Sequence, residues 1–469
     1  MHEEICYASA TDLATKIRSK VLSPVEVVQA HLERIEALNP RLNAIVTFAE
    51  DAHQQAEAAE AAVMRGDDLG PLHGVPYTLK DCVEVAGLRT TQGSKLFEDY
   101  VSRKDATVYA RLKNAGGILL GKTNLPEFAL WWETDNLVFG RTCNPWDLER
   151  TPGGSSGGEA AAIASGLSPL GIGTDLGGSI REPAHLCGIV GLKPTLGRVA
   201  CTGIQPQTLL RATHAGPLAR TVQDIALGLS IIAGPDGLDI YAPPIPVPDY
   251  RASLDSPLPR LKVGWSRTGG IPVVAEVQDT VAAAAKALSG LGLEVEQVEI
   301  PALTEKDAGR ISTSIYLAEA GLYLSDIISG RESDLTEILR NRYVNSPPRT
   351  FQEYLEASVE WEALRREVAE YFTRYDLFLC PTAPMAAFPH GQREFVIEGQ
   401  TLVGRHALRA TVPWDLTGSP AISVPFGWSP EGLPIGVQLV GRHFDEVTVL
   451  RVARALEACQ KERRRPPLG

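Results

Sequence analysis

The sequence predicts a single α/β domain in which a central, mixed and mostly parallel β-sheet is covered by helices on both faces. Two observations lead to this prediction. Short apolar runs alternate with glycine-rich turns and alanine-rich helices over much of the chain, which is the pattern of a buried sheet covered by helices. No internal repeat, low-complexity tract or glycine/serine linker divides the 469 residues into two folding units.

The first 66 residues are predicted to form helices without visible chemistry. Ser23, Pro24 and Glu26 have the arrangement of a helix start, with a serine N-cap, a proline at the first helical position and a glutamate at the third. A second helix, rich in alanine and glutamate, is expected at about 50–65 and ends near Gly66. We therefore expect these residues to form a packed helical layer.

Strands are expected where a short apolar run is bounded by turn residues. The predicted strands lie at residues 75–79, 117–121, 170–173, 261–265, 293–300, 377–379 and 420–425. A helix is expected at about 276–289, and the segment 302–375 is mostly helical and charged. The alternation of helices and strands therefore extends over nearly the whole chain.

Composition excludes several classes of function. The net charge of −12 offers no overall attraction to nucleic acid or to an anionic membrane. No run of 18 apolar residues predicts a transmembrane helix, and the N-terminus lacks the basic and apolar regions of a secretory signal. The seven cysteines form no C-x-x-C pair, and the nine histidines form no metal-binding motif. We expect reduced thiols, a cytoplasmic location and no metal site.

The most unusual segments are rich in glycine and serine. They read TPGGSSGGEAA at 151–161 and GIGTDLGGSIREP at 171–183. A flexible linker is disfavoured because helix and strand patterns flank both segments. A phosphate-binding loop is disfavoured because the Walker pattern is absent and no lysine follows the glycines.

Acyl transfer explains these segments better. Glycine lets the backbone approach a substrate carbonyl closely, and a hydroxyl at the end of the turn could attack that carbonyl. Successive N–H groups could converge on the developing oxyanion, and the expected donors are Leu176, Gly177, Gly178 and Ser179.

The two segments together resemble the amidase signature, a long pattern with fixed Gly, Ser, Asp and Arg positions. The flanking segments 73–81 and 187–195 resemble the same family. The likeness extends over about 10–235 and 375–460, and is loose between them. It implies one amidase domain, 1–469, made of an N-terminal helical layer (1–66), a signature core (67–235 and 376–469) and a variable helical region on the substrate side (236–375).

The resemblance implies a serine hydrolase that needs no cofactor or metal. The nucleophile of such enzymes corresponds to Ser179, and the relay hydroxyl to Ser155, which is expected after a cis peptide bond from Gly154. The base corresponds to Lys80. A lysine can accept a proton only when neutral, and burial without a carboxylate partner lowers its pKa from about 10.4.

Other residues are expected to support this triad. Thr174 matches a position whose hydroxyl assists the triad, and Asp175 and Arg181 are expected to hold the glycine turn in shape. Ser156 is expected to be a hydrogen-bonding neighbour. His185 and His214 suggest a Ser–His pair, but the presence of Lys80 disfavours histidine catalysis.

The substrate pocket is predicted from position and residue type. Trp131 and Trp132 occupy a segment that lines the acyl pocket in the family, and as adjacent residues they are expected to point to opposite sides, one into the cavity and one into the core. A tryptophan face suits an aryl amide or an aryl carbamate (urethane). The further expected pocket residues are Asn136, Gly154, Arg211 and Tyr316, with Met385 a weaker candidate.

Three functions remain open. The first is a stand-alone amidohydrolase acting on a small amide or carbamate. The second is the glutamine-hydrolysing component of a tRNA-dependent amidotransferase; it is disfavoured because the Arg and Asp that recognise glutamine have no match after residue 300, where 340–344 read RNRYV. The third is a non-enzymatic scaffold, disfavoured because the triad is complete. The sequence predicts neither nucleic-acid nor membrane partners and leaves a homodimer open.

Overall fold

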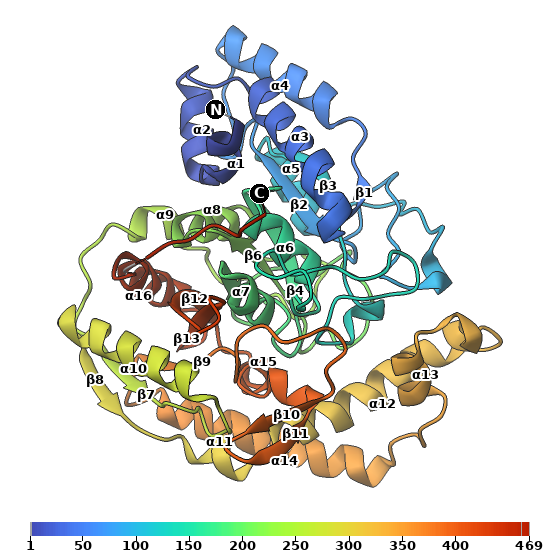
Figure 1. The fold of residues 1–469 in the computed structure, drawn as a ribbon, viewed down its shortest axis with the longest axis vertical. Helices are drawn as coiled ribbons and strands as arrows, with labels where there is room; N and C mark the ends of the chain where they lie inside the picture. The colour runs from blue at the N-terminus through green and yellow to red at the C-terminus, as the bar shows by residue number, and fades with distance from the viewer. Residues whose placement is uncertain (1, 461, 469) are drawn as a thin grey trace.

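An eleven-stranded mixed sheet forms the centre of the computed structural model (Figure 1). The structure describes residues 2–460 and 462–468; positions 1, 461 and 469 of the expected 1–469 domain lie outside them. The strands, in spatial order, are β1 (Ile45–Phe48), β3 (Ile118–Thr123), β2 (Pro76–Lys80), β4 (Leu170–Asp175), β6 (His214–Ala219), β5 (Val190–Lys193), β12 (Ala421–Trp428), β13 (Pro434–Gly441), β9 (Leu377–Pro381), β7 (Lys262–Trp265) and β8 (Glu294–Gln297). The mixed α/β fold is therefore confirmed.

The expectation of a mostly parallel sheet is wrong. Four neighbouring pairs are parallel, β2 with β3 and β4, and β7 with β8 and β9. The other six pairs, which include all those between β4 and β9, are antiparallel. Once helices cover both faces, a central strand is an unbroken apolar run in either orientation, so the sequence pattern does not reveal direction.

Helices surround this sheet. The N-terminal ones are α1 (His2–Tyr7), α2 (Ala10–Arg18), α3 (Pro24–Leu42) and α4 (Ala52–Arg65). Those of the middle of the chain are α5 (Thr107–Asn114), α6 (Gly157–Ala164), α7 (Arg181–Cys187), α8 (Val222–Ile232), α9 (Tyr250–Ser253), α10 (Ala275–Gly290), α11 (Pro301–Glu305), α12 (Ala308–Ile328), α13 (Glu337–Tyr343) and α14 (Phe351–Tyr371). The last are α15 (Val412–Thr417) and α16 (Glu446–Ala458).

Short elements complete the fold. A separate two-stranded hairpin consists of β10 (Glu394–Ile397) and β11 (Gln400–Val403). The 3₁₀ helices are η1 (Lys95–Phe97), η2 (Glu127–Ala129), η3 (Glu332–Asp334) and η4 (Gly404–Leu408). In Figure 1, α12, α13, α14 and the β10–β11 hairpin lie together on the side of the molecule away from α1–α4.

The helix boundaries follow the predicted local signals. Ser23 caps α3 and forms a capping box with Glu26, which satisfies N–H groups that the first helical turn leaves free. Helix α4 ends at Gly66, which has the left-handed φ of 80° that glycine adopts without steric strain. The predicted helix at 276–289 and its flanking strands correspond to α10, β7 and β8.

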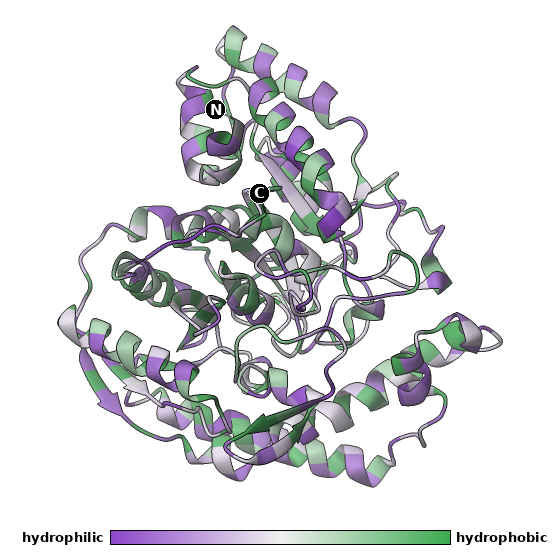
Figure 2. Cartoon of the chain, viewed as in Figure 1, coloured by the Kyte–Doolittle hydropathy of each residue, from purple (hydrophilic) through white to green (hydrophobic). Residues whose placement is uncertain are grey.

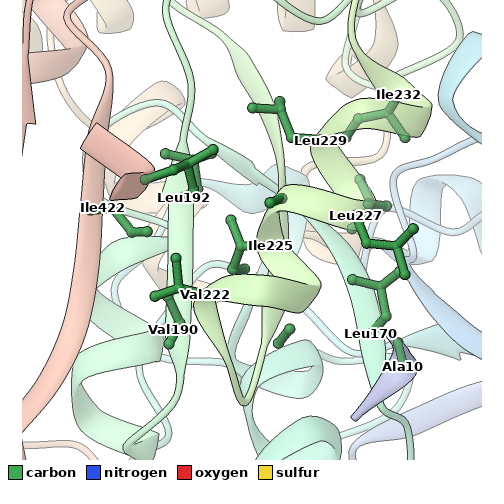
Figure 3. Close-up of a cluster of buried hydrophobic side chains, with 14 of the residues drawn as sticks. Ala10, Leu170, Val190, Leu192, Val222, Ile225, Leu227, Leu229, Ile232 and Ile422 are labelled. Atoms are coloured by element: carbon green, nitrogen blue, oxygen red, sulfur yellow. The ribbon is translucent and has the colours of Figure 1, made fainter. Parts of the chain in front are cut away.

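Helices α7 and α8 cover opposite faces of β5. The alternate residues Val190 and Leu192 pack against α8 in the main core cluster (Figure 3). The intervening Gly191 faces α7, where a Cβ atom would lie 2.8 Å from the Cβ of Ala184. Because successive side chains of a strand point to opposite faces, the sheet is buried on both sides.

Hydropathy differs between the centre and the edge of the molecule. The edge strand β8 is largely hydrophilic, whereas α10 and α14 alternate between hydrophilic and hydrophobic residues along their length (Figure 2). The strands next to the site, β2 and β4, are buried at every position. This rigid centre holds the side chains described next.

Candidate active site

Lys80 ends strand β2 and is fully buried. Its Nζ donates to Ser155 Oγ at 2.6 Å and to Thr174 Oγ1 at 2.8 Å. No carboxylate of the described residues lies within salt-bridge distance, unlike at the neighbouring Lys122, whose Nζ lies 3.0 Å from Asp81. Burial lowers the pKa of Lys80 to about 8, so a neutral amine is accessible near neutral pH.

Ser155 lies in the loop that precedes α6. The peptide bond from Gly154 to Ser155 is cis, as the resemblance implied. The next residue connects this loop to the glycine turn, because Ser156 N–H donates to the Ser179 carbonyl at 3.1 Å. Ser156 Oγ also donates to the Thr174 carbonyl. The loop is thus fixed against both β4 and the turn.

Ser179 ends the turn between β4 and α7. Its hydroxyl makes no hydrogen bond to Ser155 within residues 2–460 and 462–468, although the two segments are joined through Ser156. The preceding Gly178 has φ +129°, and a Cβ there would lie 2.1 Å from Thr411 Oγ1. Only glycine fits this position, which explains the G-G-S pattern.

The N–H groups of this turn divide into two kinds. Gly178 N–H donates to Asp175 Oδ1 at 2.6 Å, so the expectation that it joins an oxyanion hole is wrong. The N–H groups of Leu176, Gly177 and Ser179 have no acceptor in the part of the chain that the structure describes. The carbonyls of Leu176 and Gly177 accept bonds from Tyr316 and Thr411, which fixes the orientation of those peptides.

A buried charge cluster lies under the turn. Arg181 contacts Asp175 at 3.0 Å and Asp415 at 2.6 Å, and all three side chains are fully buried. Asp175 also accepts from Ile180 N–H at 3.0 Å. Although burial acts to raise the pKa of Asp175, Arg181 holds it well below its usual range. The carboxylate therefore stays ionised and anchors the turn.

A cavity of about 70 Å³ opens at Ser179. It is lined by Ala129, Leu130, Trp131, Trp132, Leu176, Gly177, Ser179, Thr313, Tyr316, Leu317, Arg342, Tyr343, Arg405, Leu408 and Val412. Trp131, Leu317, Arg342 and Tyr343 also line an adjoining outer groove of about 1010 Å³. The inner cavity has room for on the order of five water-sized groups, so any longer part of a ligand extends outward.

The two tryptophans do not point to opposite sides. Trp131 and Trp132 stack with ring centroids 3.5 Å apart, and both line the cavity. Trp132 is the more buried and also packs against Phe388 and Phe395. The expectation was wrong because alternation requires a strand, whereas this segment follows Phe128 and Ala129, which both have positive φ.

Several expected pocket residues lie elsewhere. Asn136 bonds to Asn124 and to backbone groups of its own loop and does not line the cavity. Arg211 pairs with Glu319 outside the cavity. Gly154 packs against the backbone of the tryptophan segment. Of the four further pocket residues that were expected, only Tyr316 lines the cavity.

The histidines and Met385 also lie outside the cavity. His185 bonds to the backbone of Gly436 and Met385, and His214 bonds to the carbonyl of Asp175. Burial lowers the pKa of both imidazoles. Neither contacts Ser179, so the geometry offers no Ser–His pair.

Sequence reasoning missed two arginines of the cavity wall. Arg342 lies on α13 and Arg405 on η4, and no motif marks either position. The signal available was the segment 340–344, which departs from the amidotransferase pattern. Among the described residues, no group of His, Cys, Asp or Glu could hold a metal ion, and no described helix is long and apolar enough to cross a membrane.

Comparisons with known proteins extend over the whole chain. The family model described as Amidase matches residues 26–450. The GatA-type component of the glutamyl-tRNA(Gln) amidotransferase of Moorella thermoacetica is 39% identical, over 99% of both chains. A structure described as revealing the evolutionary origins of an s-triazine catabolic enzyme has a TM-score of 0.91 at 32% identity, over 96% of this chain and 98% of that one. A 6-aminohexanoate cyclic dimer hydrolase with bound substrate has a TM-score of 0.89 at 31% identity, over 99% of both chains.

Proposed function

This chain belongs to the Amidase family, and from that premise we propose that it is a serine hydrolase that cleaves C–N acyl bonds with Ser179, Ser155 and Lys80. The observation that carries the proposal is the environment of Lys80. A fully buried lysine, bonded to two hydroxyls and to no carboxylate, is arranged to accept a proton. A structural lysine at this depth would need a counter-ion.

In the proposed first step, neutral Lys80 takes the proton of Ser155 as Ser155 takes that of Ser179. The Ser179 Oγ attacks the substrate carbonyl carbon, and the carbonyl π electrons move to oxygen. The N–H groups of Leu176, Gly177 and Ser179, which have no acceptor in the described chain, are the donors for that oxyanion. The Asp175–Arg181 pair holds this turn in place.

In the second step the proton returns. Lysine ammonium passes it through Ser155 to the leaving nitrogen, the C–N bond breaks, and an acyl ester remains on Ser179. Water then attacks the ester, with the same relay accepting its proton, and the acid leaves. A carbamate or urea-like bond can follow the same steps, because the atoms that react are a carbonyl carbon and a nitrogen leaving group.

The test is a hydrolysis screen over small aliphatic amides, aryl amides and carbamates, with Ser179→Ala as control. The proposal predicts turnover of at least one class, inhibition by a fluorophosphonate, and neither with the variant. Turnover that survives in Ser179→Ala at the native rate would contradict it.

A second candidate is the glutamine-hydrolysing component of a tRNA-dependent amidotransferase. Sequence similarity favours it, since the Moorella thermoacetica amidotransferase component is 39% identical over 99% of both chains. The cavity disfavours it, because no carboxylate of the described residues lines the site to pair with the α-ammonium of glutamine. Glutaminase assays of the chain alone and with the other components of such an enzyme separate the two candidates.

We also propose a cytoplasmic location. All seven cysteines are free thiols, and five of them are buried, which fits a reducing compartment. The proposed partner is a small amide or carbamate substrate. Non-reducing electrophoresis of protein taken directly from the host cell tests this, with no disulfide-linked species expected.

A further inference from the structure

The wall of the cavity opposite the glycine turn holds two arginines. Arg405 donates to the hydroxyls of Ser312 and Thr313 on α12. Arg342 donates to the carbonyl of Leu130 at 3.1 Å and lies over the Trp131 ring. Both guanidinium groups line the same cavity as Ser179, and their contacts with the protein fix them there.

Neither arginine has an acidic partner among the described residues. Comparable arginines of this chain do, since Arg211 pairs with Glu319 and Arg393 with Glu133. Burial lowers the pKa of Arg405 to about 10, and the charge of Arg342 adds to this effect. The two cations are thus close enough to repel each other and share no counter-ion.

The remaining polar groups of the cavity are also donors. The indole N–H groups of Trp131 and Trp132 are buried and have no acceptor in the described chain. The Tyr316 hydroxyl is used to bind the Leu176 carbonyl. No aspartate or glutamate of the described residues lines the space. A ligand that fits must supply acceptor oxygens and negative charge.

We propose that the substrate is a small amide that also carries a carboxylate, and that Arg405 and Arg342 bind this carboxylate while Ser179 attacks the amide carbonyl. This inference rests on the proposed function and specifies its substrate class. A guanidinium group binds a carboxylate through paired, charge-assisted hydrogen bonds, and a partly desolvated cavity strengthens them. The half-amides of four- and five-carbon dicarboxylic acids have this chemistry and a size that suits the inner cavity.

Three five-carbon amides test the proposal because they differ by one group at a time. Glutaramate carries a carboxylate, pentanamide replaces it by a methyl group, and glutamine adds an α-ammonium to glutaramate. We expect kcat/KM for glutaramate, or for its four-carbon analogue succinamate, to exceed that for pentanamide at least tenfold. Glutamine should fall below glutaramate, because its ammonium meets two arginines and no carboxylate.

Substitutions locate the effect. Arg405→Gln and Arg342→Gln should each reduce the ratio of kcat/KM for the half-amide to that for pentanamide by tenfold or more. Arg211→Gln is the matched control, an arginine outside the cavity, and should leave that ratio unchanged. Thermal unfolding of each variant separates a lost contact from a lost fold.

A binding readout protects the test against a variant that fails to fold. Glutarate should slow the labelling of native protein by a fluorophosphonate, whereas the neutral diamide glutaramide should not. Equal protection by both, or an equal or higher kcat/KM for pentanamide, would overturn the carboxylate proposal. Failure of the proposed function is a different result, in which native protein neither reacts with the fluorophosphonate nor hydrolyses any amide.

Discussion

The two walls of the cavity at Ser179 are built in different ways. The catalytic wall, formed by Lys80, Ser155 and residues 174–181, comes from β2, the loop before α6 and the turn after β4, and it is nearly all buried. The recognition wall, formed by Trp131, Trp132, Arg342 and Arg405, comes from a loop, α13 and η4, and is in part accessible to solvent.

This difference separates chemistry from specificity. On the catalytic wall, backbone groups and buried ions hold each reacting atom, so few substitutions are tolerated. On the recognition wall, side chains from segments far apart in sequence meet, and each can change without disturbing the turn. One reaction can therefore serve different substrates within a family, as fold alone does not decide function.

The largest expected effect is on the catalytic wall. Ser179→Ala should lower kcat by about 10⁴- to 10⁶-fold, and Lys80→Ala and Ser155→Ala should each lose several orders of magnitude, because the three act as one proton relay. Steady-state kinetics of the single variants and of the triple variant measure this. Losses that add on a logarithmic scale would contradict a shared relay.

The next effect concerns the stability of the same wall. Arg181→Met leaves Asp175 and Asp415 buried without their cation, and should lower the free energy of unfolding by about 3–5 kcal/mol. Arg310→Gln, at an exposed pair with Glu360, is the control and should lose less than about 1 kcal/mol. Denaturant titration measures both. Similar losses in the two variants would show that the cluster does not anchor the turn.

The pH dependence should also arise from the catalytic wall. Since burial lowers the pKa of Lys80 to about 8, the neutral base is populated as pH rises. The rate of fluorophosphonate labelling should increase about tenfold per pH unit below 8 and level off above it. A rate that is flat from pH 6 to 9 would mean that Lys80 does not titrate in this range.

The smallest effect is expected on the recognition wall. Trp131→Ala removes one face of the stacked pair and should raise KM about tenfold, equivalent to about 1.4 kcal/mol, with little change in kcat. Trp428→Ala is the control, since Trp428 stacks on Trp146 away from the cavity. If kcat fell instead while KM stayed constant, Trp131 would act on the reaction and not on binding.

The same division decides how much the sequence could predict. Lys80, Ser155 and Ser179 are in motifs whose glycines and hydroxyls follow from the chemistry, and the capped helix α3 follows from Ser23 and Glu26. Strand direction could not be predicted, because buried apolar runs are alike in parallel and antiparallel sheets. The engagement of Gly178 by Asp175 depends on the geometry of one turn.

The pocket was the least predictable part. Arg405 and Arg342 are separated by about sixty positions, and only the packing of η4 near α12 and α13 brings them to one cavity. Arg211 is the opposite case, since its position near the core suggested a substrate contact and Glu319 neutralises it. Residue type alone cannot distinguish a paired arginine from an unpaired one.

Peptide mass spectrometry of the fluorophosphonate-treated protein tests the central claim most directly. The nucleophile is assigned to Ser179, and Ser155 is assigned only to proton transfer. The account predicts one adduct, on Ser179, in native protein, none in Ser179→Ala, and slow labelling of Ser179 in Lys80→Ala. An adduct on Ser155 in native protein, or unchanged labelling in Lys80→Ala, would contradict it.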